Sequence, residues 1–512
     1  MAAEAASLRT RARPTTIALA LGGLGLAAAT IANPFPYVAD DALFYLVIGR
    51  NVADGHGITF SQVVPTNGFQ PLWQAVVALL VWLAQLVGID GDRAQLRIVV
   101  IACWACLIGG IALVDRILRR LSVGDVGRTT AAAIALVILG GPYSTLATEA
   151  SLVYLLAAAL LLAIDAAVET PAHGTRSALL VGALAGLLLL ARVDTMFLVA
   201  AALTAFAWRL RGQGRSVALR SAAIAAASAG VVVAPYLAWN QVRFGRLLPI
   251  SGAVKLRLGQ LNLDPESVGR EGWLLLAGAV ALGIGATLAR RREPFAWPWL
   301  VATIGSAGAA GWYFAFSTGQ LTRGGWYHAP YVLALALGAA LAVQAVLDRV
   351  PALAPAVAIG AALVLFGAVA FSWTERTRGA NADQADAVLA FGAQARAALP
   401  ADAVLATVDY PGYVALVTRH PTVALDGLTG DFELQRDLRD LGAACTLERL
   451  GVSHVVTDAP GRLEPVPGDP GRKQQQVASW LYDAPAGAIV LDERLVTSAV
   501  GLQLWSTVAT CP

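Results

Sequence analysis

Two adjacent carboxylates, Asp40 and Asp41, begin the segment Asp40-Asp41-Ala-Leu-Phe-Tyr just after the first long apolar run of the chain. Adjacent carboxylates near lipid repel each other, so the pKa of one of them is expected to rise. A carboxylate in this position can act as a general base toward a hydroxyl group, or it can bind a cation. The alternative is a helix N-cap whose charge is solvated. The residues alone do not say which of the two aspartates would be the base.

Four cations and no acid stand between Arg243 and Arg257. The predicted topology, given below, puts this stretch outside the cytoplasm, where basic residues are normally scarce. The phosphate of a lipid-linked substrate would explain them, with Ser251 adding a donor beside Lys255. Cations that contact lipid headgroups from an interfacial helix are the alternative.

Other polar residues stand at the predicted outer ends of apolar runs. One short loop combines a cation, two aromatic side chains and an imidazole, in Arg323, Trp326, Tyr327 and His328. Aromatic faces suit sugars and polyprenyl chains, although they also populate every membrane interface. The remaining candidates for a substrate pocket are His56, Asn67, Glu149, Arg192 and Asp194. Arg192 and Asp194 can also simply neutralise each other.

The elements that must position these groups are apolar helices. Of the 512 residues, 57% are hydrophobic and 14% are charged, whereas a soluble protein carries about 25% charge. Long apolar runs recur from Thr15 to Trp373. This pattern excludes a soluble domain, a disordered chain, a nucleic-acid-binding protein and an outer-membrane barrel, and it predicts a polytopic α-helical membrane protein.

Arginine-rich connections predict the orientation. The connections 116–128, 209–220 and 290–292 are rich in arginine and should face the cytoplasm, together with the N-terminus. All three connections lie on the cytoplasmic side if the apolar stretch 71–89 lies along the membrane or re-enters it. If that stretch crossed the membrane, the connection 116–128 would lie outside. We therefore predict about eleven transmembrane helices plus one juxtamembrane helix, with the C-terminus outside.

The chain changes character after Trp373, which predicts two domains, 1–373 and 374–512. In the second, short apolar strands at 403–408, 422–425, 453–457, 488–491 and 501–505 alternate with helices near 383–398 and 432–450, which is typical of a small α/β domain.

The four cysteines form no metal motif. Cys445 and Cys511 could pair as a disulfide if this domain lies outside the cytoplasm.

These clusters, in this order, resemble the GT-C superfamily of polyprenyl-phosphate-sugar-dependent glycosyltransferases. The nearest resemblance is to bacterial relatives of the mycobacterial cell-wall arabinofuranosyltransferases. It covers the membrane region in patches and is carried by Asp40-Asp41-Ala-Leu-Phe-Tyr, Arg50-Asn-Val-Ala-Asp-Gly-His-Gly-Ile-Thr-Phe60, Thr66-Asn-Gly-Phe-Gln-Pro-Leu-Trp73, Ala147-Thr-Glu-Ala, Leu190-Ala-Arg-Val-Asp194, the 239–255 stretch and Asp426-Gly-Leu.

The resemblance implies an enzyme of the bacterial plasma membrane that moves a sugar, with arabinofuranose as one candidate, from a polyprenyl-phosphate donor. The acceptor would be an extracytoplasmic glycan, lipid or protein, and the anomeric centre would be inverted. The catalytic base would be Asp40 or Asp41. The leaving phosphate would be stabilised by Lys255, with help from Arg243, Arg257 or His328.

The same resemblance implies no redox cofactor and leaves a divalent cation (Mg²⁺, Mn²⁺ or Ca²⁺) open, because some GT-C enzymes use one and others do not. Asp40, Asp41 and Glu149 offer oxygen ligands, but their spacing does not form a recognisable ligand set. The C-terminal domain would bind or orient the acceptor.

A lipid or solute transporter is the main alternative, since polar groups at span ends and many glycines suit both functions. Transporters usually keep ionisable groups near the middle of the membrane, often in repeated halves with broken helices. The charged groups of this chain gather at one predicted face instead, and no repeat is visible. A non-catalytic scaffold would leave the paired aspartates and the basic stretch unexplained.

Overall fold

The structure is a computed structural model that describes residues 14–512 except 142–144, 170–173, 258–259, 290–295, 318–323, 379, 459–462, 499–500, 508–510 and 512. The arginines of the 290–292 connection and Arg323 therefore lie outside the described residues.

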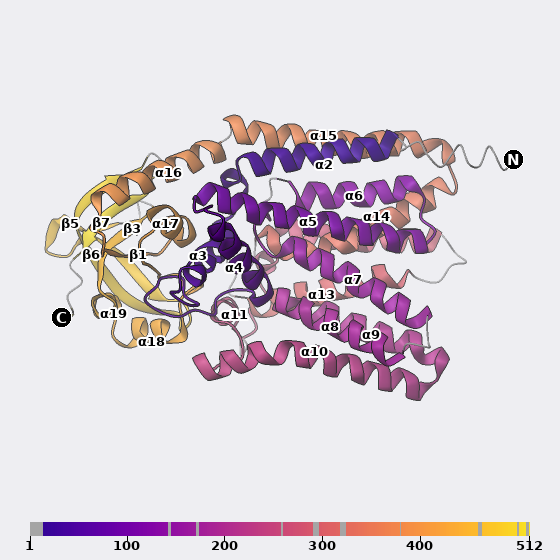
Figure 1. Cartoon of the computed structure of the whole chain (residues 1–512), viewed down its shortest axis with the longest axis horizontal. Helices are drawn as coiled ribbons and strands as arrows, with labels where there is room; N and C mark the ends of the chain where they lie inside the picture. The colour runs from indigo at the N-terminus through magenta and orange to yellow at the C-terminus, as the bar shows by residue number, and fades with distance from the viewer. Residues whose placement is uncertain are drawn as a thin grey trace.

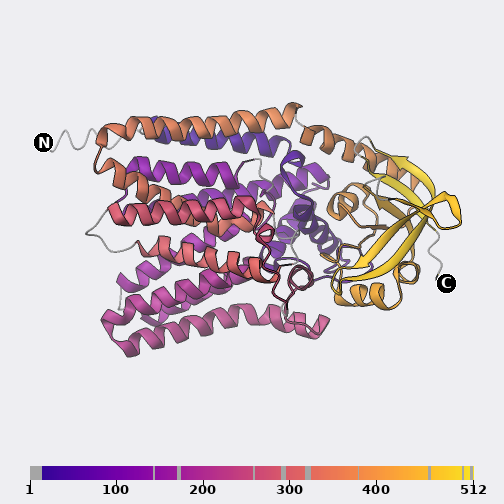
Figure 2. The same ribbon diagram turned by 180° about the vertical axis from the view of Figure 1, so that it is seen from behind.

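Long helices with nearly parallel axes form a bundle, and a sheet domain lies at one end of it (Figures 1 and 2). The bundle helices are α2 (Pro14–Ala32), α5 (Asp92–Arg120), α6 (Asp125–Leu139), α7 (Ala150–Glu169), α8 (Gly174–Ala191), α9 (Met196–Leu210), α10 (Arg215–Phe244), α12 (Gly269–Ala289), α13 (Trp297–Phe316), α14 (Ala329–Leu347) and α15 (Ala354–Arg378). Two shorter helices, α3 (Asp40–Ala53) and α4 (Pro71–Leu86), lie between the bundle and the sheet domain.

Within the described chain, eight helical segments are long and apolar enough to cross a membrane, and the chain is a multi-pass membrane protein as predicted. The predicted eleven crossings would also need α2, α6 and α13, which fall outside that group, so the number of crossings stays a prediction. Helix α4 packs against α3 beside the sheet domain. It begins with Pro71 in its first turn, where a missing N–H costs nothing.

Small residues allow the helices to approach closely. A Cβ atom added to Gly182 of α8 would lie 2.1 Å from the carbonyl oxygen of Ala225 in α10. One added to Gly283 of α12 would lie 1.9 Å from the Trp299 ring of α13. These glycines of the bundle therefore serve helix packing, as is common in membrane proteins.

The C-terminal domain contains one seven-stranded mixed sheet in the order β2-β1-β3-β7-β6-β5-β4, in which β1 is parallel to β2 and β3 and the later pairs are antiparallel. Its elements are α16 (Ala380–Ala398), β1 (Val404–Thr407), α17 (Pro411–Thr418), β2 (Thr422–Ala424), α18 (Phe432–Asp440), α19 (Ala443–Arg449), β3 (Val452–Thr457), β4 (Glu464–Val466), β5 (Asp469–Ser479), β6 (Ala484–Thr497) and β7 (Gln503–Thr507). The α/β domain is therefore confirmed.

Some of its elements differ from the prediction. The expected helix over 432–450 is divided into α18 and α19, because Gly442 adopts a φ of +83° that ends helical geometry. Helix α17 and strands β4 and β5 were not predicted. Strand β5 begins with Asp469-Pro-Gly-Arg and is mostly exposed at that end, so it lacks the apolar alternation that signals a strand.

The start of α17, which follows β1, and the loop after β2 hold the domain on the bundle. A Cβ atom on Gly412, after β1, would lie 2.4 Å from the carbonyl oxygen of Asp40 in α3. A Cβ atom on Gly68, in the loop before α4, would lie 1.8 Å from the carbonyl oxygen of Leu428, after β2. The carboxyl ends of parallel strands, a frequent place for binding sites, thus meet the segment that carries the paired aspartates.

Candidate active site

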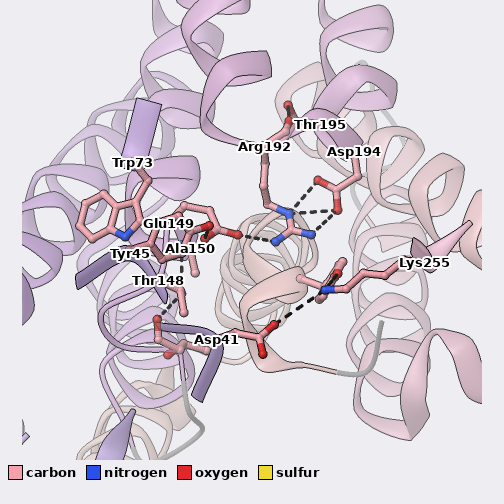
Figure 3. A network of polar contacts seen from close by, with 12 residues as sticks. Asp41, Tyr45, Trp73, Thr148, Glu149, Ala150, Arg192, Asp194, Thr195 and Lys255 are labelled. Carbon is pink, nitrogen blue, oxygen red and sulfur yellow. Dashed lines mark hydrogen bonds and ion pairs between the residues drawn. The ribbon is translucent and has the colours of Figure 1, made fainter. Parts of the chain in front are cut away.

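Asp41 and Lys255 lie side by side in the lining of a small cavity at the junction between the bundle and the sheet domain (Figure 3). The Lys255 Nζ atom lies 3.7 Å from Asp41 Oδ2 and donates a hydrogen bond of 3.1 Å to the Tyr327 hydroxyl oxygen. The lining of the cavity comes from α3, from the loop before α4, from the residues just before α7 and just after α8, from α11 (Ile250–Lys255), from the turn before α14 and from the loop after β2. It includes Tyr45, Gln70, Glu149, Arg192, Ser251, Trp326 and Leu428.

The backbone around each of these two groups favours its charge and position. Asp41 lies in the first turn of α3, where the helix dipole favours a carboxylate. Lys255 is the last residue of the short helix α11, where the dipole favours a cation. Burial alone would lower the pKa of Lys255, but Tyr327 and Asp41 raise it above the ordinary value. An ammonium group beside a carboxylate is therefore held at the cavity wall.

Asn67 fixes the start of α11. Its side chain is fully buried, its Oδ1 accepts a 3.0 Å hydrogen bond from the Ile250 backbone N–H, and its Nδ2 donates one of 3.0 Å to Asn240 Oδ1. One amide therefore joins the loop before α4 to α10 and α11. Asn67, predicted as a pocket residue, instead holds the helix that presents Lys255.

A buried ion network forms one wall of the cavity (Figure 3). Arg192, 3% exposed, pairs with Glu149, 2% exposed, and its Nε lies 2.8 Å from Asp194 Oδ1. The Tyr45 hydroxyl donates to Glu149 at 2.8 Å, and that of Tyr313 donates to Asp194 at 2.7 Å. Because each carboxylate is held by Arg192 and by a tyrosine hydroxyl, the network forms a rigid wall.

Asp40 points away from this cavity, toward the sheet domain. Its Oδ1 accepts a 2.7 Å hydrogen bond from the backbone N–H of Tyr413, and its Oδ2 accepts one of 3.1 Å from that of Gly412. Burial raises the pKa of Asp40 well above its ordinary value, although the Tyr413 amide acts in the opposite direction. Both oxygens are thus occupied in joining α3 to α17.

A larger and mainly apolar cavity of about 850 Å³ adjoins the first one, and Arg192, Ser251, Lys255 and Tyr327 line both. Its walls come from the end of α10, from α11 and α13, and from three residues of the sheet domain, Phe432, Leu481 and Tyr482. Asp483, next along the chain, pairs with Arg257 at 3.0 Å. The turn between β5 and β6 therefore closes one side of the cavity.

Several predicted site residues lie elsewhere. Arg243 and His56 share a separate depression beside Trp239. Arg257 pairs with Asp483 and lines neither cavity. His328 is buried against Tyr331 and also lines neither cavity. The structure brings together Asp41, Glu149, Arg192, Asp194, Ser251, Lys255, Trp326 and Tyr327 around the two cavities.

Tyr45, which lines the first cavity, and Asp426, which interacts electrostatically with Asp41 and Lys255, are two of the site residues that were not singled out from the sequence. Tyr45 holds Glu149, as described above. Asp426, in the loop after β2, accepts a 2.9 Å hydrogen bond from the Leu428 backbone N–H. Burial, and then the charge of Asp41, raise the pKa of Asp426 to about 7. Both residues lie in segments that carry the family resemblance, and that was the available signal.

Cys445 and Cys511 are joined by a disulfide bond. Among the described residues, no group of three or more His, Cys, Asp or Glu side chains is arranged to hold a metal ion. The carboxylates of Asp40 and Glu149, offered above as metal ligands, are instead engaged with backbone amides and with Arg192.

No protein-family model matches the chain, and no curated protein sequence matches it. Similar solved structures include ArnT from Cupriavidus metallidurans bound to undecaprenyl phosphate, with a TM-score of 0.60 and 15% identity over 97% of this chain and 98% of that chain. They also include the archaeal oligosaccharyltransferase AglB from Archaeoglobus fulgidus, in complex with an inhibitory peptide and a dolichol-phosphate, with a TM-score of 0.54 and 12% identity over 87% of this chain and 69% of that chain. The predicted GT-C fold is therefore confirmed.

Proposed function

We propose that this GT-C-fold protein is an inverting glycosyltransferase that takes a sugar from a polyprenyl-phosphate donor. The observation that carries the proposal is the pairing of Asp41 with Lys255, 3.7 Å apart, where a small cavity of about 40 Å³ with a mixed polar and apolar lining adjoins an apolar cavity of about 850 Å³. Such a reaction requires a base for the acceptor hydroxyl, a cation for the donor phosphate and an apolar cavity for the donor lipid.

In the proposed reaction, the carboxylate of Asp41 takes the proton of an acceptor hydroxyl. The acceptor oxygen forms a bond to the anomeric carbon of the sugar while the bond from that carbon to the phosphate oxygen breaks. The leaving phosphate keeps the electron pair of that bond, and the developing charge is stabilised by Lys255. Such a single displacement inverts the anomeric centre. Asp40 is unsuited to be the base because its oxygens already accept two amides.

The lipid part of the donor would occupy the larger cavity, whose aromatic and aliphatic lining comes from both parts of the chain. The structures of ArnT with undecaprenyl phosphate and of AglB with a dolichol-phosphate support a lipid phosphate as the donor group. Arabinofuranose is the sugar to test first, because of the sequence resemblance in the first loop. The acceptor would be a glycan, lipid or protein of the cell envelope, reached through the sheet domain.

We also propose the bacterial plasma membrane as the location, with the N-terminus cytoplasmic, a membrane domain over 1–373 and an extracytoplasmic domain over 374–512. The disulfide between Cys445 and Cys511 supports an oxidising side for that domain.

The test is a transfer assay in which purified protein is incubated with radiolabelled polyprenyl-phosphate sugars and membrane acceptors. Wild type should form a glycosylated product with inverted anomeric configuration, and Asp41→Asn should not. A protein that transfers no sugar from any donor tried, but moves a lipid or solute across proteoliposome membranes, would be a transporter and would overturn the proposal.

A further inference from the structure

A groove of about 520 Å³ lies between α5, α7 and α8, and it shares no residue with the two cavities of the candidate site. Its walls come from Leu113 of α5 and from Leu180 and Leu184 of α8. Its floor is the face of α7 that carries Ala159, Leu162, Ala163 and Ala166, where small side chains leave room for a ligand. The groove is apolar except at one end.

That end is lined by three arginines of the last turns of α5, Arg116, Arg119 and Arg120. Their spacing puts them on one side of the helix, and α5 ends far from the sheet domain (Figure 1). Arg119 pairs with Asp115 at 2.6 Å, and Arg120 lies 3.3 Å from the exposed Glu169 and 3.8 Å from Asp165. Arg116 is exposed and makes no ion pair with any residue that the structure describes.

We propose that this groove binds one anionic phospholipid, with the phosphate among the three guanidinium groups and an acyl chain along the alanine floor of α7. Guanidinium groups match phosphate oxygens in geometry and charge. The three helices that form the groove are all candidate membrane spans, so its apolar part lies at the depth of lipid chains. A soluble phosphate would use the arginines but not the floor.

The experiment is native mass spectrometry of the full-length protein with added phosphatidylglycerol or phosphatidylcholine of identical acyl chains. Wild type should hold one phosphatidylglycerol more tightly than any phosphatidylcholine. Arg116→Ala should weaken that binding about fivefold, the contribution expected of one interfacial cation. Ala166→Trp, which fills the exposed floor and leaves the arginines in place, should weaken it as well.

Arg220→Ala is the matched control, because Arg220 is exposed on α10 and does not line the groove. Its affinity for phosphatidylglycerol should equal that of wild type. Equal affinity of wild type for the two lipids would overturn the proposal, and so would an equal loss in Arg220→Ala and Arg116→Ala. If Ala166→Trp bound phosphatidylglycerol as tightly as wild type, the arginines would bind an ion without a lipid groove. The same conclusion would follow if soluble glycerol phosphate competed as strongly as the lipid.

Discussion

Replacing Asp41 with asparagine should remove sugar transfer and leave the fold intact. The Asp41 side chain is 29% exposed and lies 3.7 Å from the buried Lys255, so asparagine, which has the same shape but no charge, should cost about 1 to 2 kcal/mol of stability. Loss of a general base reduces the rate about 10²- to 10⁴-fold. That corresponds to about 3 to 5 kcal/mol of transition-state stabilisation. The effect on chemistry should therefore far exceed the effect on folding.

Asp40→Asn is the matched control, because it makes the same chemical change one residue away. Asp40 accepts hydrogen bonds from two backbone amides, of Gly412 and Tyr413, whereas asparagine offers one acceptor oxygen. One amide would lose its acceptor, at a cost of about 1 to 3 kcal/mol. This variant should melt at a lower temperature than Asp41→Asn and keep a higher single-turnover rate.

The assay measures single-turnover transfer from a saturating labelled donor and thermal unfolding in the same detergent. If Asp40→Asn were inactive with an unchanged melting temperature while Asp41→Asn turned over normally, the base would be Asp40. Normal turnover in both variants would show that neither carboxylate takes the proton.

Three further predictions concern the rest of the site. Lys255→Ala should lower kcat/KM for the donor about 10- to 150-fold, as expected for a charge-assisted phosphate contact, and unchanged donor kinetics would place the phosphate elsewhere. The pKa of Asp426 is raised to about 7 in the folded protein, so the folded state keeps a proton that the unfolded chain releases near pH 4. The free energy of unfolding should therefore fall as the pH rises from about 4 to about 7. Asp426→Asn should flatten that fall in melting temperature, and an unaltered profile would contradict it. Asp483→Asn, which breaks the exposed ion pair with Arg257, should raise the donor KM with little change in melting temperature, and an unaltered KM would show that the turn between β5 and β6 does not close the cavity.

The membrane helices and most of the sheet domain could be predicted from the sequence because hydrophobic runs and their spacing are local properties. The choice between Asp40 and Asp41 could not. Consecutive residues on a helix point about 100° apart, so one of them faces Lys255 and the other faces away. Which one does so depends on α17, which contributes the Gly412 and Tyr413 amides from more than 350 residues along the chain.

The basic stretch from Arg243 to Arg257 is a second case. Its cations are close in sequence and were expected to act together. Helix α10 ends at Phe244, the next residue, Gly245, adopts a left-handed φ of +66°, and α11 begins only after Pro249. This turn leaves Arg243 beside His56 and carries Lys255 to Asp41. The sequence shows the turn residues but not the directions that they impose on the chain.

The most direct test of the proposed site is a cryo-electron microscopy structure of the protein with bound polyprenyl phosphate. We expect a phosphate oxygen about 2.7 to 2.9 Å from Lys255 Nζ, the distance of a charge-assisted hydrogen bond, and the polyprenyl chain in the cavity of about 850 Å³. A phosphate bound instead in the depression of His56 and Arg243, with no lipid density near Lys255, would contradict the proposed site.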